Sequence, residues 1–122
     1  MHQFRSLAVW RVSRELSRSA YRATQVRPFS SHRDLADQVR RAAASIPANL
    51  AEGYGLGTHP QLIRCARMAL ASSSELETHL ELAVEVGALE PEPGTTLIEL
   101  TRRASSLIIG YLKALSGRRG GS

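Results

Sequence analysis

Aromatic residues, cysteine and long apolar runs are scarce in this chain. Only 5% of its 122 residues are aromatic, namely one Trp, three Tyr and two Phe. A core with so few large rings must be built from Leu, Ile, Val and Ala, which suits closely packed helices better than a sheet. No apolar run approaches the roughly 20 residues that a membrane-spanning helix needs, so we expect no membrane partner.

Cysteine occurs once, as Cys65, which excludes an internal disulfide and is consistent with a reducing compartment. The first residues contain no apolar stretch long enough for a signal peptide, so we expect a cytoplasmic protein. A chain of 122 residues with 43% hydrophobic content is large enough to bury one core. We therefore expect a single domain, residues 1–117, followed by a flexible tail, residues 118–122.

Lysine is nearly absent, since fifteen of the sixteen basic residues are Arg and Lys113 is the exception. The formal net charge is +5, and the whole excess lies in residues 1–57, where nine Arg stand against four acidic residues. A guanidinium group binds phosphate or carboxylate through two parallel hydrogen bonds, so this choice fits nucleic acid or an acidic partner. A GC-rich genome would produce the same preference for Arg without any functional meaning.

Apolar residues recur at helical spacings of three and four through four segments of the chain. They predict helices over about residues 7–25, 31–53, 58–87 and 95–115. The apolar stripe of the second helix consists of Leu35, Val39, Ala42, Ile46 and Leu50, and that of the third of Leu62, Ala66, Ala69, Ser73, Leu76, Leu80 and Ala83. The buried side of the fourth is expected to consist of Leu97, Leu100, Ala104, Leu107, Tyr111 and Leu115. The segments between the helices are short and contain Pro, Gly or Ser, which favour turns. Four long helices with short turns predict an all-α fold, an antiparallel up-down four-helix bundle.

The first predicted helix has three distinct faces. Its apolar stripe consists of Val9, Val12, Leu16, Ala20 and Ala23. The nearly opposite face carries Arg11, Arg14, Arg18 and Arg22. A third face of mixed polarity consists of Trp10, Ser13, Ser17 and Tyr21. Because a soluble monomer rarely needs such a face, we interpret it as a candidate contact between subunits.

The second predicted helix contains Pro47, which lacks a backbone donor and crowds the carbonyl group of Ala43. We therefore expect a kink at Pro47. Gly53 is expected to end this helix with a left-handed cap, followed by a glycine-rich turn, residues 53–57. A phosphate-binding loop is the alternative interpretation of these glycines. However, the segment follows a helix rather than a strand and lacks the glycine spacing of known phosphate loops.

The third predicted helix begins at Thr58, which forms a capping box with Gln61. Its second half carries an acidic stripe that is most simply a solvated or salt-bridging face: Glu77, Glu81 and Glu85. Two prolines fall within residues 90–94, which we therefore expect to form the turn before the fourth helix.

Several short segments, spread over most of residues 4–115, are specific enough to indicate a protein family. They are residues 7–10, 38–43, 45–53, 74–80 and 86–89. In these segments the chain resembles the family of small four-helix-bundle proteins first noticed in intervening sequences of bacterial 23S rRNA genes. The most specific segment carries the expected structural motif, Pro47, Asn49, Glu52 and Gly53.

The resemblance implies an assembly and a set of partners. Known members look like cyclic homopentamers, so the resemblance implies self-association into a ring of five. A related branch comprises accessory proteins of diversity-generating retroelements, which bind a reverse transcriptase and its RNA through a basic surface. A reverse transcriptase and RNA are therefore among the partners that the resemblance implies.

The sequence shows no pattern of catalytic residues, so we expect a protein that is not an enzyme. Cys65 has no His at helical spacing, and the four His show no mutual spacing typical of metal ligands. The paired Glu-x-x-His motifs of metal sites in helix bundles are also absent. We therefore expect neither a metal site nor a cofactor.

The leading hypothesis is a binding module that contacts RNA or DNA through clustered Arg. The candidates are Arg11, Arg14, Arg18, Arg22, Arg40 and Arg41. We expect contacts without sequence preference, because no motif for reading or stacking bases is present. In the alternative interpretation these Arg are solvated or bind acidic residues of a neighbouring copy, and Arg40 and Arg41 form a structural ion-pair network with Glu52. A second hypothesis is a protein–protein scaffold, such as an accessory partner of a reverse transcriptase.

Overall fold

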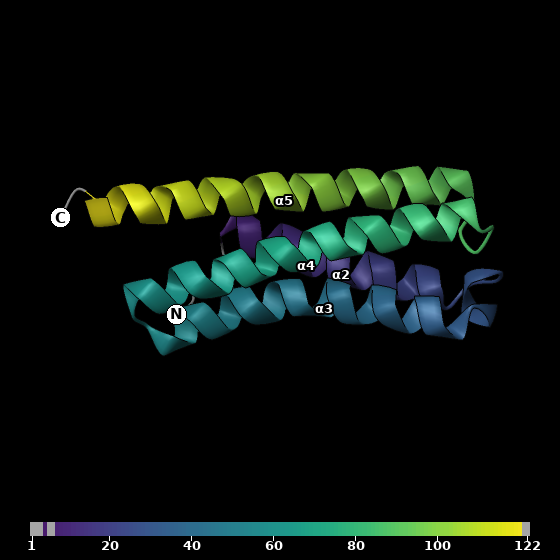
Figure 1. The fold of residues 1–122 in the computed structure, drawn as a ribbon, viewed down its shortest axis with the longest axis horizontal. Helices are drawn as coiled ribbons and strands as arrows, with labels where there is room; N and C mark the ends of the chain where they lie inside the picture. Colours follow the sequence, from purple (N-terminus) through teal and green to yellow (C-terminus); the bar gives the residue numbers. More distant parts are fainter. Residues whose placement is uncertain (1–3, 5–6, 121–122) are drawn as a thin grey trace.

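The computed structural model describes residue 4 and residues 7–120, with side chains up to residue 117. Four long helices make up most of this part of the chain: α2 (Ala8–Thr24), α3 (Arg33–Leu56), α4 (His59–Glu85) and α5 (Pro91–Gly120). A short 3-10 helix, η1 (Phe29–Ser31), lies between α2 and α3. The long helices lie side by side in alternating directions (Figure 1), which confirms the all-α antiparallel bundle.

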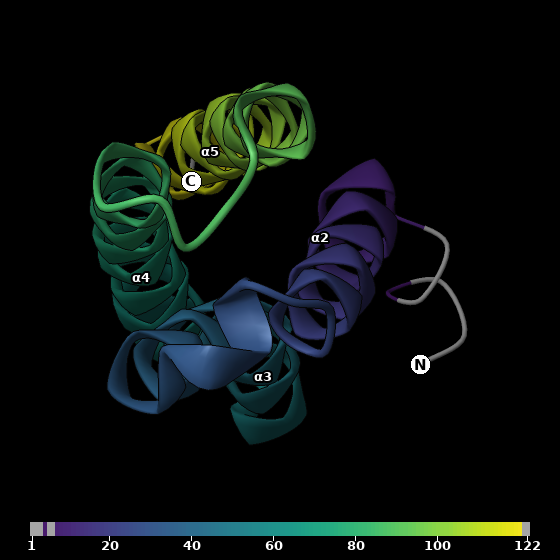
Figure 2. The same cartoon turned by 90° about the vertical axis from the view of Figure 1, so that its right-hand side faces the viewer.

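Seen end-on, the helices follow one another around the bundle in chain order (Figure 2). Each helix packs against the next one in the chain, and α2 also contacts α5. Only Gly57 and Thr58 separate α3 from α4, and residues 86–90 separate α4 from α5. Links this short make consecutive helices antiparallel neighbours.

The core is built mainly from aliphatic side chains, as the scarcity of aromatic residues predicts. Leu16, Val39, Leu76 and Leu80 are each 0% exposed. Phe29, in η1, is the largest of the fully buried side chains and lies at the end of the bundle where α2 turns into α3. The apolar stripes of the first three predicted helices therefore face inward.

The stripe of α5 differs in part from the prediction. Leu97, Ala104 and Leu115 are buried as expected. The fully buried positions between them are taken by Thr101 and Ile108, each 0% exposed. Leu100, Leu107 and Tyr111 lie at the edge of the core and are half-buried. The centre of the buried face lies one residue after the predicted positions Leu100 and Leu107, because polar Thr101 is buried and Leu residues at neighbouring positions mask the periodicity.

The predicted end of the second helix is wrong. The helix continues past Gly53 to Leu56, and the left-handed cap is Gly57, whose φ is +80°. Its N–H donates to the carbonyl oxygen of Gly53 over 3.3 Å. Gly53 is instead needed for packing, because a Cβ added there would lie 2.8 Å from the Cβ of Cys65 in α4. The glycine-rich turn at residues 53–57 is thus mostly helix, which leaves no loop to hold a phosphate.

Pro47 is buried inside α3, and side-chain donors flank it on the helix. The Ser45 hydroxyl donates to the carbonyl of Ala42 over 2.8 Å, and the Asn49 amide donates to the carbonyl of Ser45 over 2.8 Å. These bonds add donors to the helix close to the place where proline supplies none. They give Asn49 of the motif a structural role, while the kink at Pro47 stays a prediction.

The start of the fourth helix is also corrected. α5 begins at Pro91 and includes residues 91–94, which the sequence predicts as a turn. Prolines fit a first helical turn because its N–H groups have no partner within the helix. The N–H of Gly94 donates to the carbonyl of Glu90 over 2.9 Å, which closes this turn. At its other end α5 includes residues 118–120 of the predicted tail, and residues 121–122 lie outside the described residues.

Thr58 is the N-cap residue of α4, as predicted, but it makes no side-chain capping bond. Gln61, its expected partner, accepts a hydrogen bond from Nε of Arg64 over 2.9 Å instead. The position of the helix start was therefore predicted correctly and the capping box was not.

Candidate nucleic-acid interface

The four Arg of the first predicted helix all lie on α2 and are exposed. They stand away from the buried stripe of this helix, which anchors α2 in the bundle. Among the residues that the structure describes, Arg11, Arg18 and Arg22 make no hydrogen bond or ion pair, so their guanidinium groups face solvent. The four residues concerned are Arg11, Arg14, Arg18 and Arg22.

Three of these Arg line a shallow groove of about 550 Å³ beside α2. Its lining consists of Ala8, Trp10, Arg11, Val12, Arg14, Glu15, Arg18 and Arg103. Arg103 comes from α5, so the groove lies along the side of the bundle where α2 and α5 meet. Four guanidinium groups against the single carboxylate of Glu15 give this groove a positive charge.

Arg103 is the functional candidate that the sequence analysis missed. Its neighbour Arg102 binds Glu77 and Glu81 of α4, with N–O distances of 3.0 and 3.8 Å. One Arg of this pair thus joins α5 to α4, and the other, one helical step of about 100° away, lines the groove beside α2. The sequence shows the adjacent pair Arg102 and Arg103. Which of the two contacts α4 and which lines the groove can be assigned only from the packing of α5 between α4 and α2.

Arg14 lies over the ring of Trp10, one turn earlier on α2, with its guanidinium carbon 4.9 Å from the ring centroid. Trp10 in turn contacts the ring of Phe4, whose other neighbour is Tyr54 of α3. The stack of Phe4 and Tyr54 has a centroid distance of 4.6 Å. These contacts hold the Trp10 ring in place, and with it the position of Arg14 at the groove.

Arg40 belongs to the packing between α2 and α3 rather than to a free basic surface. It forms an ion pair with Asp37 and donates to the Thr24 hydroxyl over 3.0 Å. Its guanidinium also lies over the Tyr21 ring, 5.5 Å from the centroid. The structural alternative therefore describes Arg40 better, with Asp37 in place of the expected Glu52. Arg41 is exposed and makes no hydrogen bond or ion pair with another described residue.

The face of α2 predicted as a subunit contact is largely covered within the chain. Ser13 is 0% exposed and donates to the carbonyl of Val9 over 2.7 Å, so its assignment to an outer face is wrong. Trp10 packs on Phe4, and Tyr21, although 52% exposed, carries Arg40 on its ring. Ser17 is half-buried. This face is turned toward α3, because α2 packs against two helices, α3 and α5, and therefore buries more than one stripe.

The acidic stripe of α4 is partly salt-bridged, through the contacts of Arg102 with Glu77 and Glu81. No helix in the described part of the chain combines the length and the hydropathy needed to cross a membrane. The described His, Cys, Asp and Glu side chains form no group of three that would hold a metal ion. Cys65 is a buried thiol against Gly53.

The model of the 23S rRNA-intervening sequence protein family matches residues 5–110. The chain belongs to this family. The chain is also similar to the crystal structure of a protein with unknown function from the S23 ribosomal protein family of Bacteroides thetaiotaomicron. The two share 20% sequence identity and a TM-score of 0.76 over 87% of this chain and 99% of the other. That likeness shows a shared four-helix fold. No curated protein matches the chain.

Proposed function

We propose that this family member binds RNA or DNA, without catalysis, along the basic groove between α2 and α5. The observation that carries the proposal is the group of exposed Arg on α2 that make no ion pair with any residue the structure describes, joined by Arg103 of α5. Guanidinium groups that are held on rigid helices and outnumber the nearby carboxylates are suited to bind phosphate. Contacts to phosphate supply most of the affinity in binding that does not depend on sequence.

The dimensions of the basic surface fit a short stretch of one strand. Arg11 and Arg22 are eleven residues apart, which corresponds to about 16 Å along a helix. Successive phosphates of one DNA strand advance by about 3.4 Å along the duplex axis, so the row of Arg matches roughly five phosphates. Trp10 does not offer its ring to a base, because Arg14 and Phe4 both lie against it. We therefore expect little base preference.

The test compares two double variants with the same loss of charge. R11Q/R18Q removes two Arg from the groove, whereas R27Q/R33Q removes two exposed Arg near the turn between α2 and α3. Binding of a labelled single strand and a labelled duplex is measured over a range of salt concentrations. We expect the groove variant to lose on the order of tenfold or more in affinity at low salt and the control to lose much less. Equal losses in both variants, or no retardation of any nucleic acid by the wild type, would contradict the proposal.

A protein scaffold is the second candidate, and exposed apolar side chains favour it. Met68 and Leu82 of α4 and Ile109 of α5 are each more than 40% exposed. We propose that the protein acts as a homo-oligomer, for which the family resemblance implies a ring of five, and that a reverse transcriptase is a candidate partner. Sedimentation of the purified protein tests the assembly, and a 13.3 kDa monomer at micromolar concentration would exclude it.

A further inference from the structure

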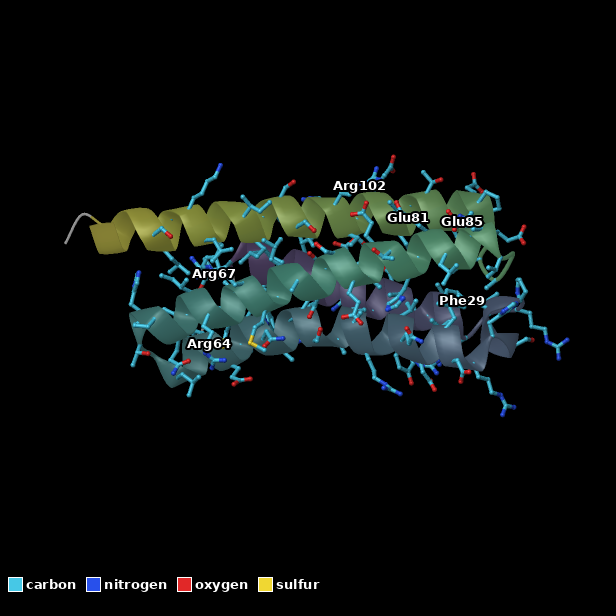
Figure 3. The ribbon with its side chains drawn as sticks, in the orientation of Figure 1. Phe29, Arg64, Arg67, Glu81, Glu85 and Arg102 are labelled. Carbon is cyan, nitrogen blue, oxygen red and sulfur yellow. The ribbon has the colours of Figure 1, made fainter. Side chains whose placement is uncertain are left out.

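A second hollow lies between α2 and α5, as the basic groove does. Its volume is about 670 Å³, and its lining includes Arg22, Ala23, Val26, Glu92, Pro93 and Leu97. The first three of these residues come from the end of α2 and the residues just after it, and the other three come from the first turns of α5. The hollow therefore lies at the end of the bundle where Figure 3 labels Phe29. The basic groove, which reaches Ala8 and Arg103, continues along the same two antiparallel helices toward the other end.

The row of Arg on α2 connects the groove to the hollow. Arg18 lines the groove, and Arg22, one turn later, lines the hollow. The groove has four Arg against the one carboxylate of Glu15, whereas the hollow has Arg22 against the one carboxylate of Glu92. The strong positive charge thus reaches the edge of the hollow and does not continue through its lining. A chain of phosphates attracted along the Arg row meets a surface of a different kind there.

That surface is formed largely by apolar side chains. Val26 is 64% exposed, more than any other large apolar side chain that the structure describes. Pro93 is also exposed, and Leu97 is buried in the bundle. Covering Val26 and Pro93 with another apolar face removes this surface from water, which is favourable. The face of a nucleobase is suited to this, because proteins bind unstacked bases against apolar or aromatic side chains.

We propose that the groove and the hollow together bind single-stranded nucleic acid, with phosphates along the Arg row and one base in the hollow against Val26 and Pro93. The inference rests on the proposed function and adds a base site to it. Val26 comes four residues after Arg22, or about 6 Å at the rise of a helix, so one nucleotide spans from the guanidinium group to the hollow. Apolar side chains contact the face of a base and do not read its edge, so little base preference is still expected.

The base site distinguishes a single strand from a duplex. Each base of a duplex is stacked and paired, so it enters the hollow only after it has been unstacked and unpaired, which costs free energy. The bases of a flexible single strand carry little of this cost. A duplex can still place the phosphates of one strand along the Arg row, but the hollow adds nothing to its affinity.

The charges along α2 favour a nucleic acid strand over a second copy of the chain as the occupant. Each nucleotide carries one phosphate and one base, so a strand supplies charge for the Arg row and an apolar face for the hollow within a few nucleotides. A second copy would have to present a row of carboxylates with an apolar side chain beyond it. The acidic stripe of α4 is already partly neutralised, since Arg102 binds Glu77 and Glu81.

The test compares three probes of equal length by fluorescence anisotropy at low salt: an oligothymidine, an abasic strand with the same phosphates, and a duplex. Val26→Asn removes the apolar wall of the hollow without changing charge. Val86→Asn is the matched control, because Val86 is 53% exposed and does not line the hollow. Circular dichroism should show the same helicity in the wild type and both variants.

We expect the wild type to bind the oligothymidine on the order of tenfold tighter than the abasic strand. Val26→Asn should weaken binding of the oligothymidine on the order of fivefold and leave the abasic strand and the duplex unchanged. Val86→Asn should leave all three affinities unchanged. The oligothymidine thus loses most of its advantage over the abasic strand only when the wall of the hollow is altered.

Equal binding of the oligothymidine and the abasic strand by the wild type would overturn the base site and leave the proposed function standing. A loss in Val26→Asn that is the same for all three probes, no loss for any of them, or an equal loss in Val86→Asn would also overturn it. If Val26→Asn lowers the mass of the free protein in sedimentation, a second copy covers the hollow and the proposal is wrong. Failure of the wild type to bind any probe would refute the proposed function and the base site together.

Discussion

Gly53 of α3 lies directly against Cys65 of α4, so close that a Cβ on Gly53 would be 2.8 Å from the Cβ of Cys65. The same Cβ would lie 3.3 Å from the Cα of Leu62. Because one of these neighbours is backbone, it cannot turn aside as a flexible side chain would. The absence of a side chain at residue 53 therefore fixes how closely α3 and α4 approach at this end of the bundle.

Gly53→Ala should lower the free energy of unfolding by about 1–3 kcal/mol, because the added methyl group forces the two helices apart. Gly55→Ala is the matched control two residues later in the same helix, where an added Cβ meets no atom of the described part of the chain within 4 Å. There we expect a gain of about 0.5–1 kcal/mol from reduced flexibility of the unfolded chain and better helix propensity. Urea denaturation measures both, and equal effects of the two substitutions would contradict the packing role of Gly53.

Gly57→Ala should cost about 1–2 kcal/mol, since the φ of +80° at this cap is unfavourable for a residue with a Cβ. Among the described residues, no atom lies within 4 Å of a Cβ added at Gly57, so the cost is conformational rather than steric. Gly57→Asn should lose less, because Asn tolerates the left-handed region better than Ala. If the Gly57→Ala variant melts at the same temperature as the Gly57→Asn variant or at a higher one, the cap assignment is contradicted.

Arg103→Gln should lower the slope of log affinity against log salt by about one, if Arg103 contacts one phosphate in the groove. Arg102→Gln is the control, because it removes the same charge from the adjacent residue, whose side chain binds Glu77 and Glu81. We expect the slope of the Arg102 variant to stay near that of the wild type. Titrations of a fluorescent oligonucleotide at several salt concentrations measure the two slopes, and identical slopes would remove Arg103 from the interface.

Arg40→Gln should destabilise the protein by on the order of 1 kcal/mol, because it removes the contacts with Asp37, Thr24 and the Tyr21 ring together. Arg41→Gln, at the next residue and exposed, should change stability by less than about 0.5 kcal/mol. Thermal denaturation measures the difference. If the two variants unfold alike, Arg40 does not hold α2 against α3.

The fold could be predicted from the sequence because apolar residues recur with the period of an α-helix through long segments. The inward positions of α2, α3 and α4 were predicted correctly from spacing alone, as Leu16, Val39 and Leu76 show. The ends of the helices were harder to predict, because the same residue type can indicate either a helix end or a position inside a helix. Gly53 resembles a C-cap in sequence, but the true cap is Gly57, and only the neighbouring helix reveals why Gly53 is a glycine. Pro91 and Pro93 resemble a turn, yet proline is equally suited to the first turn of a helix.

The candidate site was predictable only for side chains on a single helix. Arg11, Arg14 and Arg18 share a face of α2 by spacing, and the structure leaves them exposed. Arg103 was missed and Arg40 misassigned because their surroundings come from other helices. Ser13 was misassigned for the same reason, since the face of α2 toward α3 cannot be identified before the helices are arranged.

The two-residue link between α3 and α4 has a consequence for the order in which the protein folds. Gly57 and Thr58 alone separate these helices, so residues that meet across the α3–α4 seam are close in the chain near the link. Closing a short loop costs little chain entropy, and contacts between residues close in sequence form fastest. The α3–α4 hairpin is therefore the part of the chain best placed to serve as a template on which α5 and then α2 dock. On this account, Gly53→Ala slows folding itself, whereas substitutions in α2 mainly speed unfolding.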